Sequence, residues 1–381
     1  MLLNHRKALT GIGLTAAAVA GTAFLAAPAQ AASAGLAKVV GSSTVDFRAL
    51  MGKSNALTIT ISGRTVTLDD KVAIKAGRGC KAVRNDRTKV KCKTSSATKK
   101  LSVSLGDKND SVTNKTSVYL LANGGTGNDT LTGGNGKDEL QGAAGNDKLY
   151  GRGGNDTIFG EAGNDRIDAG AGNDRVDAGA GDDRVWGAAG NDTILAAAGK
   201  DSVYAGAGND IVEGGTQDDS LYGDAGNDVL VGEAGNDRID GGANDDTVDG
   251  GAGNDRLYGG ASKDIVLGGA GNDWIAAGAD DDIAFGLAGD DRIYGEAGND
   301  VLVGENLSET GEQTGSNAAR DVLDGGAQSD DLCLVMAGGT TVNCERGISS
   351  TTGLALTAAT AVRVRTEVRA PLGKVAPQPV G

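Results

Sequence analysis

Several residue types are scarce in this chain of 381 residues, and each shortage narrows the possible folds and activities. Aromatic residues make up 3% of the sequence, proline occurs four times, and the single histidine is His5. A conventional core depends on bulky side chains, so we expect a repetitive architecture filled by small aliphatic residues. Without a histidine beyond His5, a Ser-His-Asp triad or a histidine-ligated zinc site cannot form. We therefore predict that the protein is not an enzyme.

The chain has one long apolar run, which lies at its N-terminus. Arg6 and Lys7 precede an apolar stretch at residues 8–27, and Ala29-Gln30-Ala31 then fits the small-x-small pattern of a cleavage site. We expect residues 1–31 to be a signal peptide, which would make the mature protein secreted and extracellular. An uncleaved membrane anchor is the alternative. No other run is long enough to span a membrane, so no transmembrane segment is expected after signal removal.

Cysteine is also rare, with four residues in the chain. An even number in an exported protein suggests disulfides. Local pairing, Cys80 with Cys92 and Cys333 with Cys344, is the simplest of the three connectivities. A metal site built from all four thiolates is the alternative, and the wide spacing without a CxxC disfavours it.

Charge is divided unevenly along the chain. Residues 32–123 carry a net charge of +11, whereas residues 124–303 carry −25. The acidic part would repel the phosphates of nucleic acid, so we expect no nucleic-acid partner. Cations are the expected partners of such a field.

A nine-residue repeat fills the acidic part from Gly124 to Val303, in 20 units without an insertion. The sixth position is aspartate in every unit, the eighth is Leu, Ile or Val in all but one, and the fourth is glycine in sixteen. Glycine, asparagine and aspartate favour turns, so positions one to six are predicted to be turn and positions seven to nine a short strand. Two units then make one coil, with the eighth side chain facing inward between two parallel sheets.

The repeat resembles the pattern GGxGxDxUx, where U is aliphatic, of the RTX family. Residues 268–276, GGAGNDWIA, and 250–258, GGAGNDRLY, match every constrained position. The resemblance covers about half of the chain and implies a secreted bacterial calcium-binding protein. It also implies an all-β fold, a right-handed parallel β-roll with two short strands in each coil of 18 residues.

Physical chemistry supports the same ion independently of the resemblance. Stacked coils bring the sixth-position carboxylates about one strand spacing apart, and their repulsion opposes folding unless a cation lies between them. Calcium prefers carboxylate and carbonyl oxygens, whereas zinc and copper prefer nitrogen and sulfur, which these turns lack. A metal-free solenoid, in which the aspartates only build turns, is the alternative.

The resemblance implies metal ligands of two kinds: carboxylates of the sixth-position aspartates and carbonyl groups of turn residues at positions such as two and four. The aspartates are Asp129, Asp138, Asp147, Asp156, Asp165, Asp174, Asp183, Asp192, Asp201, Asp210, Asp219, Asp228, Asp237, Asp246, Asp255, Asp264, Asp273, Asp282, Asp291 and Asp300. The fourth-position glycines assigned as carbonyl donors are Gly127, Gly136, Gly145, Gly154, Gly163, Gly172, Gly253, Gly271 and Gly298. Gln217 and Ser262 replace this glycine, and we expect weak or empty sites near them.

The flanking segments are assigned separate roles. Residues 32–123 are predicted to form a basic, β-rich cap, with a hairpin in 57–68 and a worn repeat in which Asp110 takes the sixth position. The β-roll is assigned to residues 124–333, with an insertion at 304–320. Asp321 and Leu323, and then Asp330 and Leu332, are expected to take the sixth and eighth positions of its last two units. Residues 334–347 would form a disulfide-closed end, and 348–381 a low-complexity tail.

Two functions remain open at this point. The chain is predicted to be a secreted, non-enzymatic calcium-binding protein that serves as a surface or structural module. The alternative is a calcium-dependent adhesin that docks to an anionic cell-surface polymer through the basic N-terminal module. A pore-forming toxin would need long membrane-active helices, which the sequence lacks once residues 1–31 are removed. Neither the oligomeric state nor the ligand of the cap is indicated by the residues.

Overall fold

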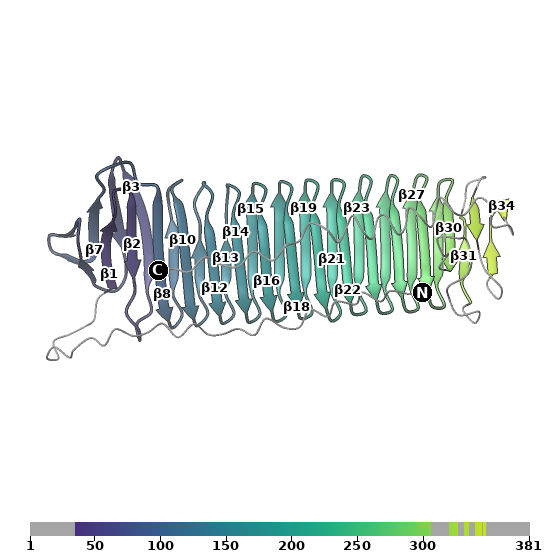
Figure 1. The fold of residues 1–381 in the computed structure, drawn as a ribbon, viewed down its shortest axis with the longest axis horizontal. Coiled ribbons are helices and arrows are strands. Elements are labelled where there is room, and N and C mark those ends of the chain that lie inside the picture. The colour runs from purple at the N-terminus through teal and green to yellow at the C-terminus, as the bar shows by residue number, and fades with distance from the viewer. Residues whose placement is uncertain (1–34, 306–319, 327–330, 335–339, 345, 348–381) are drawn as a thin grey trace, which may run out of the picture. The chain divides into compact units, whose positions relative to one another are not determined.

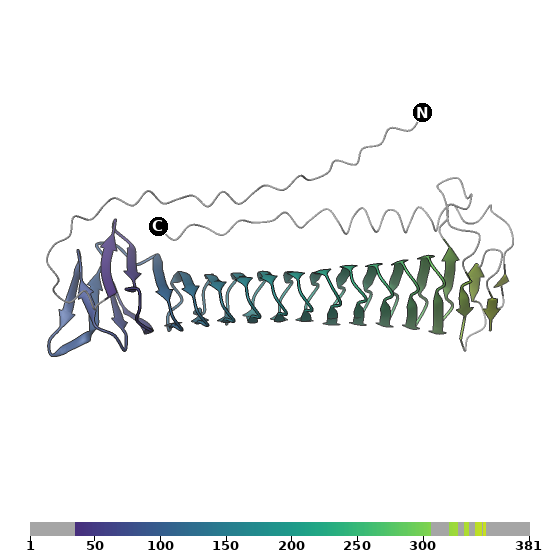
Figure 2. The ribbon, with the colours of Figure 1, turned by 90° about the horizontal axis from the view of Figure 1, so that it is seen from below.

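A computed structural model describes residues 35–305, 320–326, 331–334, 340–344 and 346–347, and every regular element within them is a β-strand (Figure 1). From residue 119 onward the chain winds through coils that contribute alternately to two sheets, which Figure 2 shows as two layers joined by turns. We call them the even sheet and the odd sheet, after the numbers of their strands in this region. The predicted parallel β-roll is thereby confirmed.

The even sheet of the roll is built from strands that lie 18 residues apart over most of its length. They are β10 (Tyr119–Thr126), β12 (Glu139–Ala144), β14 (Thr157–Ala162), β16 (Arg175–Ala180), β18 (Thr193–Ala198), β20 (Ile211–Thr216), β22 (Val229–Ala234), β24 (Thr247–Ala252), β26 (Ile265–Ala270), β28 (Ile283–Ala288), β30 (Val301–Glu305), β32 (Leu332–Leu334) and β34 (Arg346–Gly347).

The odd sheet alternates with it along the chain. Its strands are β9 (Ser111–Asn114), β11 (Thr130–Thr132), β13 (Lys148–Tyr150), β15 (Arg166–Ala171), β17 (Arg184–Ala189), β19 (Ser202–Ala207), β21 (Ser220–Ala225), β23 (Arg238–Ala243), β25 (Arg256–Ala261), β27 (Trp274–Ala279), β29 (Arg292–Ala297), β31 (Val322–Asp324) and β33 (Thr340–Val342). Pairing is parallel and in phase with the repeat, as where Val185 of β17 faces Val203 of β19.

The core is a thin file of eighth-position aliphatic side chains between the sheets. Ile167, Val203 and Leu221 are 0% exposed, and so is Ala284, the one eighth-position residue without a larger side chain. Side chains alternate along a strand, so the eighth position points inward while the seventh and ninth point outward. The inward position of these residues, predicted from the repeat, is confirmed.

The strands are longer than the sequence predicted. Strands β14 to β29 each contain six residues, which extend from the seventh position of one unit to the third position of the next. The predicted three-residue strand holds for β11 and β13. Small residues at positions one and three let neighbouring coils continue their pairing. A positive φ at position two, seen even at Glu161 (φ 73°) and Leu287 (φ 79°), bends the strand there.

The cap extends both sheets of the roll. Strands β1 (Gly35–Val40), β2 (Thr44–Arg48), β5 (Ile74–Ala76) and β8 (Lys100–Asp107) join the even sheet, while β3 (Ala56–Ser62), β4 (Thr65–Asp69), β6 (Cys80–Val83) and β7 (Asp86–Lys93) join the odd sheet. β2 pairs with β8, and β3 with β9, in parallel. The predicted hairpin is confirmed, since β3 and β4 pair from Thr58↔Asp69 to Ser62↔Thr65. This arrangement covers the first coil and its core.

Both predicted disulfides are present, Cys80–Cys92 in the cap and Cys333–Cys344 at the far end of the roll. Val322 resumes the register of the roll opposite Arg292, so the assignment of Asp321 and Leu323 holds. The last unit was predicted wrongly by one residue. Cys333 pairs with Leu302 and is 2% exposed, so Asp331 and Cys333 take the sixth and eighth positions predicted for Asp330 and Leu332.

Residues 1–31, most of the insertion at 304–320 and the tail at 348–381 lie outside the described residues. Within the part that is described, no helix has the length and apolar character needed to cross a membrane.

The odd sheet carries most of the aromatic residues of the roll. Trp186, Tyr204 and Tyr222 occupy the ninth position in successive coils of this sheet, and their rings stack with interplanar angles of 8° and 6°. The guanidinium of Arg166 lies 4.1 Å from the Trp186 ring centre and closes one end of the stack. Ring stacking therefore ties neighbouring coils together on the outside, as the aliphatic file does on the inside.

Candidate metal centre

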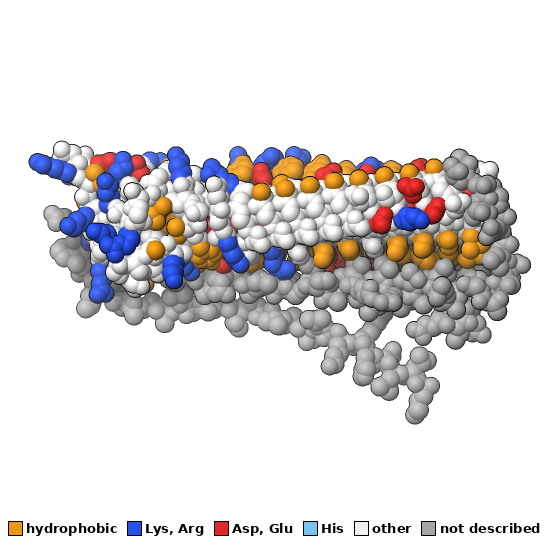
Figure 3. Space-filling model, turned by 90° about the horizontal axis from the view of Figure 1, so that it is seen from above, with side chains coloured by type: hydrophobic (Ala, Val, Ile, Leu, Met, Phe, Trp, Pro, Cys, Tyr) orange, Lys and Arg blue, Asp and Glu red, His pale blue; other side chains and the backbone are white. Residues whose placement is uncertain are grey.

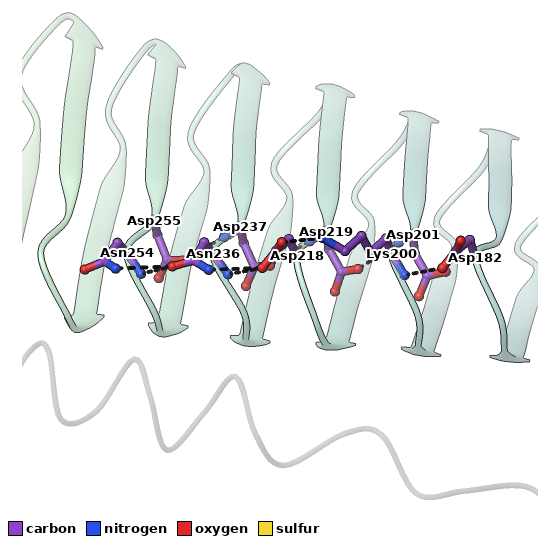
Figure 4. Close-up of polar contacts among 9 residues, drawn as sticks. All are labelled: Asp182, Lys200, Asp201, Asp218, Asp219, Asn236, Asp237, Asn254 and Asp255. Carbon is purple, nitrogen blue, oxygen red and sulfur yellow. Dashed lines mark hydrogen bonds and ion pairs between the residues drawn. The ribbon is translucent and has the colours of Figure 1, made fainter.

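The twenty sixth-position aspartates form two rows on opposite edges of the roll. Each aspartate ends a turn and precedes a strand. Those before strands of the odd sheet, such as Asp201 and Asp219, make the odd row, and those before strands of the even sheet make the even row. All twenty are buried, with 0 to 3% of each residue exposed. Figure 4 shows part of the odd row, one aspartate in each coil.

One carboxylate oxygen of each aspartate has a structural role. The backbone N–H of Asp201 donates to Asp219 Oδ1 at 2.8 Å, and the N–H of Asp219 donates to Asp237 Oδ1 at 2.8 Å. The same bond links aspartates 18 residues apart along both rows, for example Asp156 to Asp174 at 2.7 Å. This chain of hydrogen bonds fixes the spacing of the coils and orients each carboxylate.

The second carboxylate oxygen, Oδ2, takes no part in these hydrogen bonds. Eighteen of the twenty Oδ2 atoms are buried without a hydrogen-bond partner: those of Asp129, Asp147, Asp156, Asp165, Asp174, Asp183, Asp192, Asp201, Asp210, Asp219, Asp228, Asp237, Asp246, Asp255, Asp264, Asp273, Asp282 and Asp300. Buried polar groups almost always have partners, so a repeated exception on this scale needs an explanation. Asp138 differs, since its Oδ2 accepts the N–H of Gly134.

Backbone carbonyl oxygens lie beside these carboxylates. A methyl group placed on Gly214, a first-position glycine, would lie 2.6 Å from Asp219 Oδ2 and 3.0 Å from the carbonyl oxygen of Gly232 in the next coil. At Gly235, a fourth-position glycine, the same construction meets the carbonyl oxygen of Gln217 and lies 2.8 Å from Asp237 Oδ1. The other first-position glycines of the twenty units likewise have the Oδ2 of their own unit's aspartate and a first-position carbonyl oxygen of the following coil beside them, and Gly298 repeats the fourth-position contact, with Asp300 Oδ1.

The fourth-position carbonyls are free to act as ligands. None of the backbone hydrogen bonds between coils in the described residues ends on a fourth-position carbonyl oxygen. The replacements Gln217 and Ser262 keep the left-handed conformation, with φ of 81° and 82°, so the turn survives without glycine. First-position carbonyls, such as that of Gly232, were missed by the sequence reasoning, which had considered positions two and four.

Burial and mutual repulsion raise the pKa values of the row. Burial is the larger cause, and repulsion from the neighbouring aspartates of the same row adds to it. The pKa reaches about 8 at Asp156, Asp183, Asp219 and Asp264. The hydrogen bond from the preceding aspartate N–H lowers the pKa but does not compensate. The ionised rows are thus under electrostatic stress, which a cation would relieve.

The fifth positions form a separate, exposed line outside the rows. The N–H of Asn254 donates to Asn236 Oδ1 at 3.0 Å, and that of Asn236 to Asp218 Oδ1 at 3.0 Å. Lys200 lies between Asp182 and Asp218, and its ammonium pairs with Asp218 at 2.5 Å (Figure 4). Two of its lysines, Lys200 and Lys263, are thus paired within the line rather than with the buried rows.

Both rows continue beyond the twenty units. The N–H of Asp110 donates to Asp129 Oδ1 at 2.7 Å, so the worn repeat of the cap adds one aspartate in front of the odd row. At the other end, Asp291 and Asp300 donate to Asp321 and Asp331, each at 3.0 Å. Asp331 was missed because one extra residue in the last unit shifts the nine-residue register.

The donor set suits a hard divalent cation. Within the described residues, no three side chains among His, Cys, Asp and Glu are grouped closely enough to hold a metal by themselves. A site between two coils would therefore use the aspartates of those coils and turn carbonyls, all of them oxygens. Calcium accepts six to eight such ligands in flexible geometry, and sulfur or nitrogen ligands for zinc are absent from these turns.

Comparison with known proteins agrees with this chemistry. The RTX calcium-binding nonapeptide repeat, in a form with four copies, matches nine segments between residues 123 and 306. Among curated proteins, no relative matches the chain.

Proposed function

Because the repeat region, residues 123–306, belongs to the RTX calcium-binding nonapeptide repeat family, we propose that calcium drives the folding of this β-roll outside the cell and that the protein acts there as a non-enzymatic surface or structural module. The chain is a calcium-binding β-roll. The proposal adds that bound calcium ions drive its folding and that this folding takes place outside the cell. The observation that carries it is the pair of rows of buried carboxylates, in which eighteen of the twenty Oδ2 atoms lack a hydrogen-bond partner.

The roll has too few positively charged side chains to neutralise these rows. Three ion pairs of its described part lie outside the rows: Lys200–Asp218, Lys263–Asp281 and Arg238–Asp240. Carboxylates one strand spacing apart repel by roughly 1 kcal/mol in water and several-fold more when partly desolvated. Each row contains ten of them in a protein region of charge −25. Ions between successive aspartates would turn this repulsion into attraction, so folding would depend on calcium.

Three chemical features of the chain support export. The two disulfides are typical of an oxidising compartment, and extracellular fluid supplies the millimolar calcium that modest sites need. Residues 1–31 have the composition of a signal peptide. An elongated roll that folds only after export would not obstruct its own passage.

A calcium titration followed by circular dichroism tests the proposal. The purified protein is treated with a chelator and then titrated with calcium, with magnesium as the control. A cooperative rise in β-structure with calcium alone is expected, because magnesium is smaller and keeps its water. A β-spectrum that is the same in chelator and in calcium would show a metal-independent solenoid and end the proposal.

One feature of the cap favours a second function, that of a calcium-dependent adhesin. Lys81 on β6 lies directly opposite Lys91 on β7, and with Lys93 both line a hollow on this outer strand pair. Like charges directly opposite in a sheet are destabilising, and an anion bound between them would remove the cost. Figure 3 shows how densely Lys and Arg side chains cover the cap.

The adhesin function would be carried by these lysines. A variant with Lys81, Lys91 and Lys93 changed to glutamine should lose retention on an anionic cell-wall polymer in the presence of calcium. Changing three other exposed cap lysines, Lys53, Lys75 and Lys115, gives a control with the same net charge. Equal loss in both variants would show that only the overall charge matters.

A further inference from the structure

Two buried aspartates of the cap flank the start of β3 in the odd sheet. β3 pairs with β4 on one side, antiparallel, and with β9 on the other, parallel. Asp70 follows the end of β4, and Asp110 precedes the start of β9. Because β4 runs against β3 and β9 runs with it, the end of β4 and the start of β9 both lie beside the start of β3. The topology thus places the two carboxylates on either side of Asn55 and Ala56.

The contacts of these carboxylates repeat the arrangement of the rows. The N–H of Asn55 donates to Asp110 Oδ1 at 2.5 Å, and the N–H of Ala56 donates to Asp70 Oδ1 at 2.6 Å. Asp70 is 5% exposed and Asp110 is 4% exposed. The Oδ2 atom of each is buried without a hydrogen-bond partner. Adjacent backbone amides therefore hold two carboxylates that each present one unused oxygen.

Neither carboxylate is neutralised by an ion pair, in contrast to a third buried aspartate of the cap. Asp46 is also 5% exposed, but Lys38 and Arg48 approach its Oδ2 at 3.3 and 3.5 Å. Burial raises the pKa of Asp110 to about 6, and repulsion from Asp70 contributes, while Lys71 lowers it only slightly. Burial also raises the pKa of Asp70, against the lowering effect of the Ala56, Val72 and Lys71 backbone N–H groups.

We propose that Asp70 and Asp110 form a calcium site in the cap, outside the twenty regular units of the nonapeptide repeat. Asp70 belongs to no repeat unit, and the matched family segments begin only at residue 123. The inference rests on the proposed function, since it assigns the same ion to further residues. Its donor chemistry is that of the rows: carboxylate oxygens supplemented by backbone carbonyls or water.

The site has a consequence for how the cap and the roll fold. Asp110 donates its N–H to Asp129 Oδ1, so it is also the first member of the odd row. An ion shared by Asp70 and Asp110 would therefore fasten the β3–β4 hairpin to the first coil. Calcium would then order the cap together with the roll, and the cap would cover the first coil only in calcium.

Hydrogen–deuterium exchange with mass spectrometry tests the site on the purified protein, because cap peptides have unique sequences and can be assigned. In the wild type, calcium should slow exchange in peptides that cover residues 55–62 as well as in the roll. Asp70→Asn should remove the calcium-dependent protection of these cap peptides and lower the ion count in native mass spectra by one, with the roll still protected. Asp69→Asn is the matched control, since Asp69 is the neighbouring residue and pairs with Lys89 at the surface.

The outcomes separate this inference from the proposed function. Calcium protection of the roll without protection of the cap would overturn the cap site alone, and so would an Asp70→Asn protein that keeps both the cap protection and the wild-type ion count. No calcium effect on the wild-type roll would overturn the proposed function. Circular dichroism in calcium checks that Asp70→Asn folds, and Asp110→Asn provides a second variant that removes the other carboxylate.

Discussion

The substitution Asp219→Asn should have opposite effects with and without calcium. Asparagine keeps the oxygen that accepts the N–H of Asp201, so the hydrogen-bonded row stays intact. What changes is the charge at a residue that is 2% exposed and lies between Asp201 and Asp237. Asp219 is therefore a position where charge can be removed with little change in shape.

In the absence of calcium the substitution should stabilise the roll. Burial and repulsion raise the pKa of Asp219 to about 8, so at pH 7 the folded chain must protonate a group that is ionised when unfolded. At about 1.4 kcal/mol per tenfold, this costs on the order of 4 kcal/mol. Burying the asparagine amide without a full set of hydrogen-bond partners destabilises the folded state by about 1–2 kcal/mol, which offsets part of this gain. The net gain expected for Asp219→Asn is thus about 2–3 kcal/mol.

In saturating calcium the sign should reverse. Asp219 would serve the site that it shares with Asp201 and the site that it shares with Asp237, so two ions should be lost. At calcium concentrations about 100-fold above the dissociation constant, each ion contributes about 2.7 kcal/mol, giving a loss of about 5 kcal/mol. Urea unfolding in calcium and in chelator measures both effects, and native mass spectrometry counts the ions.

Asp218→Asn is the matched control, because Asp218 is the preceding residue, is exposed and pairs with Lys200. It should leave the ion count unchanged and shift stability slightly and equally in both conditions. If Asp219→Asn keeps the wild-type ion count, or destabilises the roll in chelator as much as in calcium, the reasoning is refuted.

Three further predictions follow from the same structure. Because the row aspartates have pKa values raised above the ordinary 3.8, to about 6–8 where a value is resolved, the calcium-free roll should gain stability as pH falls from 8 towards 4. Calcium should bind more weakly over the same range, which circular dichroism at pH 8 and pH 5 would show. Gly253→Ala should cost about 2 kcal/mol or more in urea unfolding, since its φ is +150° and the added methyl would collide with the Gly235 carbonyl, whereas Gln217→Ala should be nearly neutral. Tyr204→Ala breaks two ring stacks and should cost about 1–3 kcal/mol without changing the ion count.

The aliphatic core and the two aspartate rows could be predicted because each is marked by one type of side chain at a fixed position of the repeat. An aliphatic residue at every eighth position and an aspartate at every sixth leave one arrangement of coils that buries the first and stacks the second. Ile167 and Asp165 show this within a single unit. Local cysteine pairing was likewise readable from spacing alone.

Backbone features were harder to predict, because the type of a residue does not specify its backbone conformation or its strand pairing. Position two is glycine in eleven of the twenty units, but it takes a positive φ at Glu161 and Leu287 too, so composition indicates the bend in only part of the repeat. Asp331 was misassigned because a single inserted residue breaks a nine-residue register that sequence can only extend unchanged. Asp70 could not be found at all, since its partner Asp110 becomes its neighbour only through the pairing of β3 with both β4 and β9.

At each edge of the roll, the buried aspartate row and the exposed fifth-position line connect neighbouring coils by hydrogen bonds that run in opposite directions. Along the buried row, the N–H of each aspartate donates forward to the next coil, as from Asp219 to Asp237. Along the exposed line the direction is reversed, since the N–H of Asn254 donates back to Asn236. Coil spacing and register are thus set by hydrogen bonds in both directions, and none of these bonds uses Oδ2. If calcium drives folding as proposed, it would therefore act by neutralising charge rather than by setting register. A roll whose row aspartates were all changed to asparagine should consequently assemble the same coils without calcium and gain nothing when the ion is added.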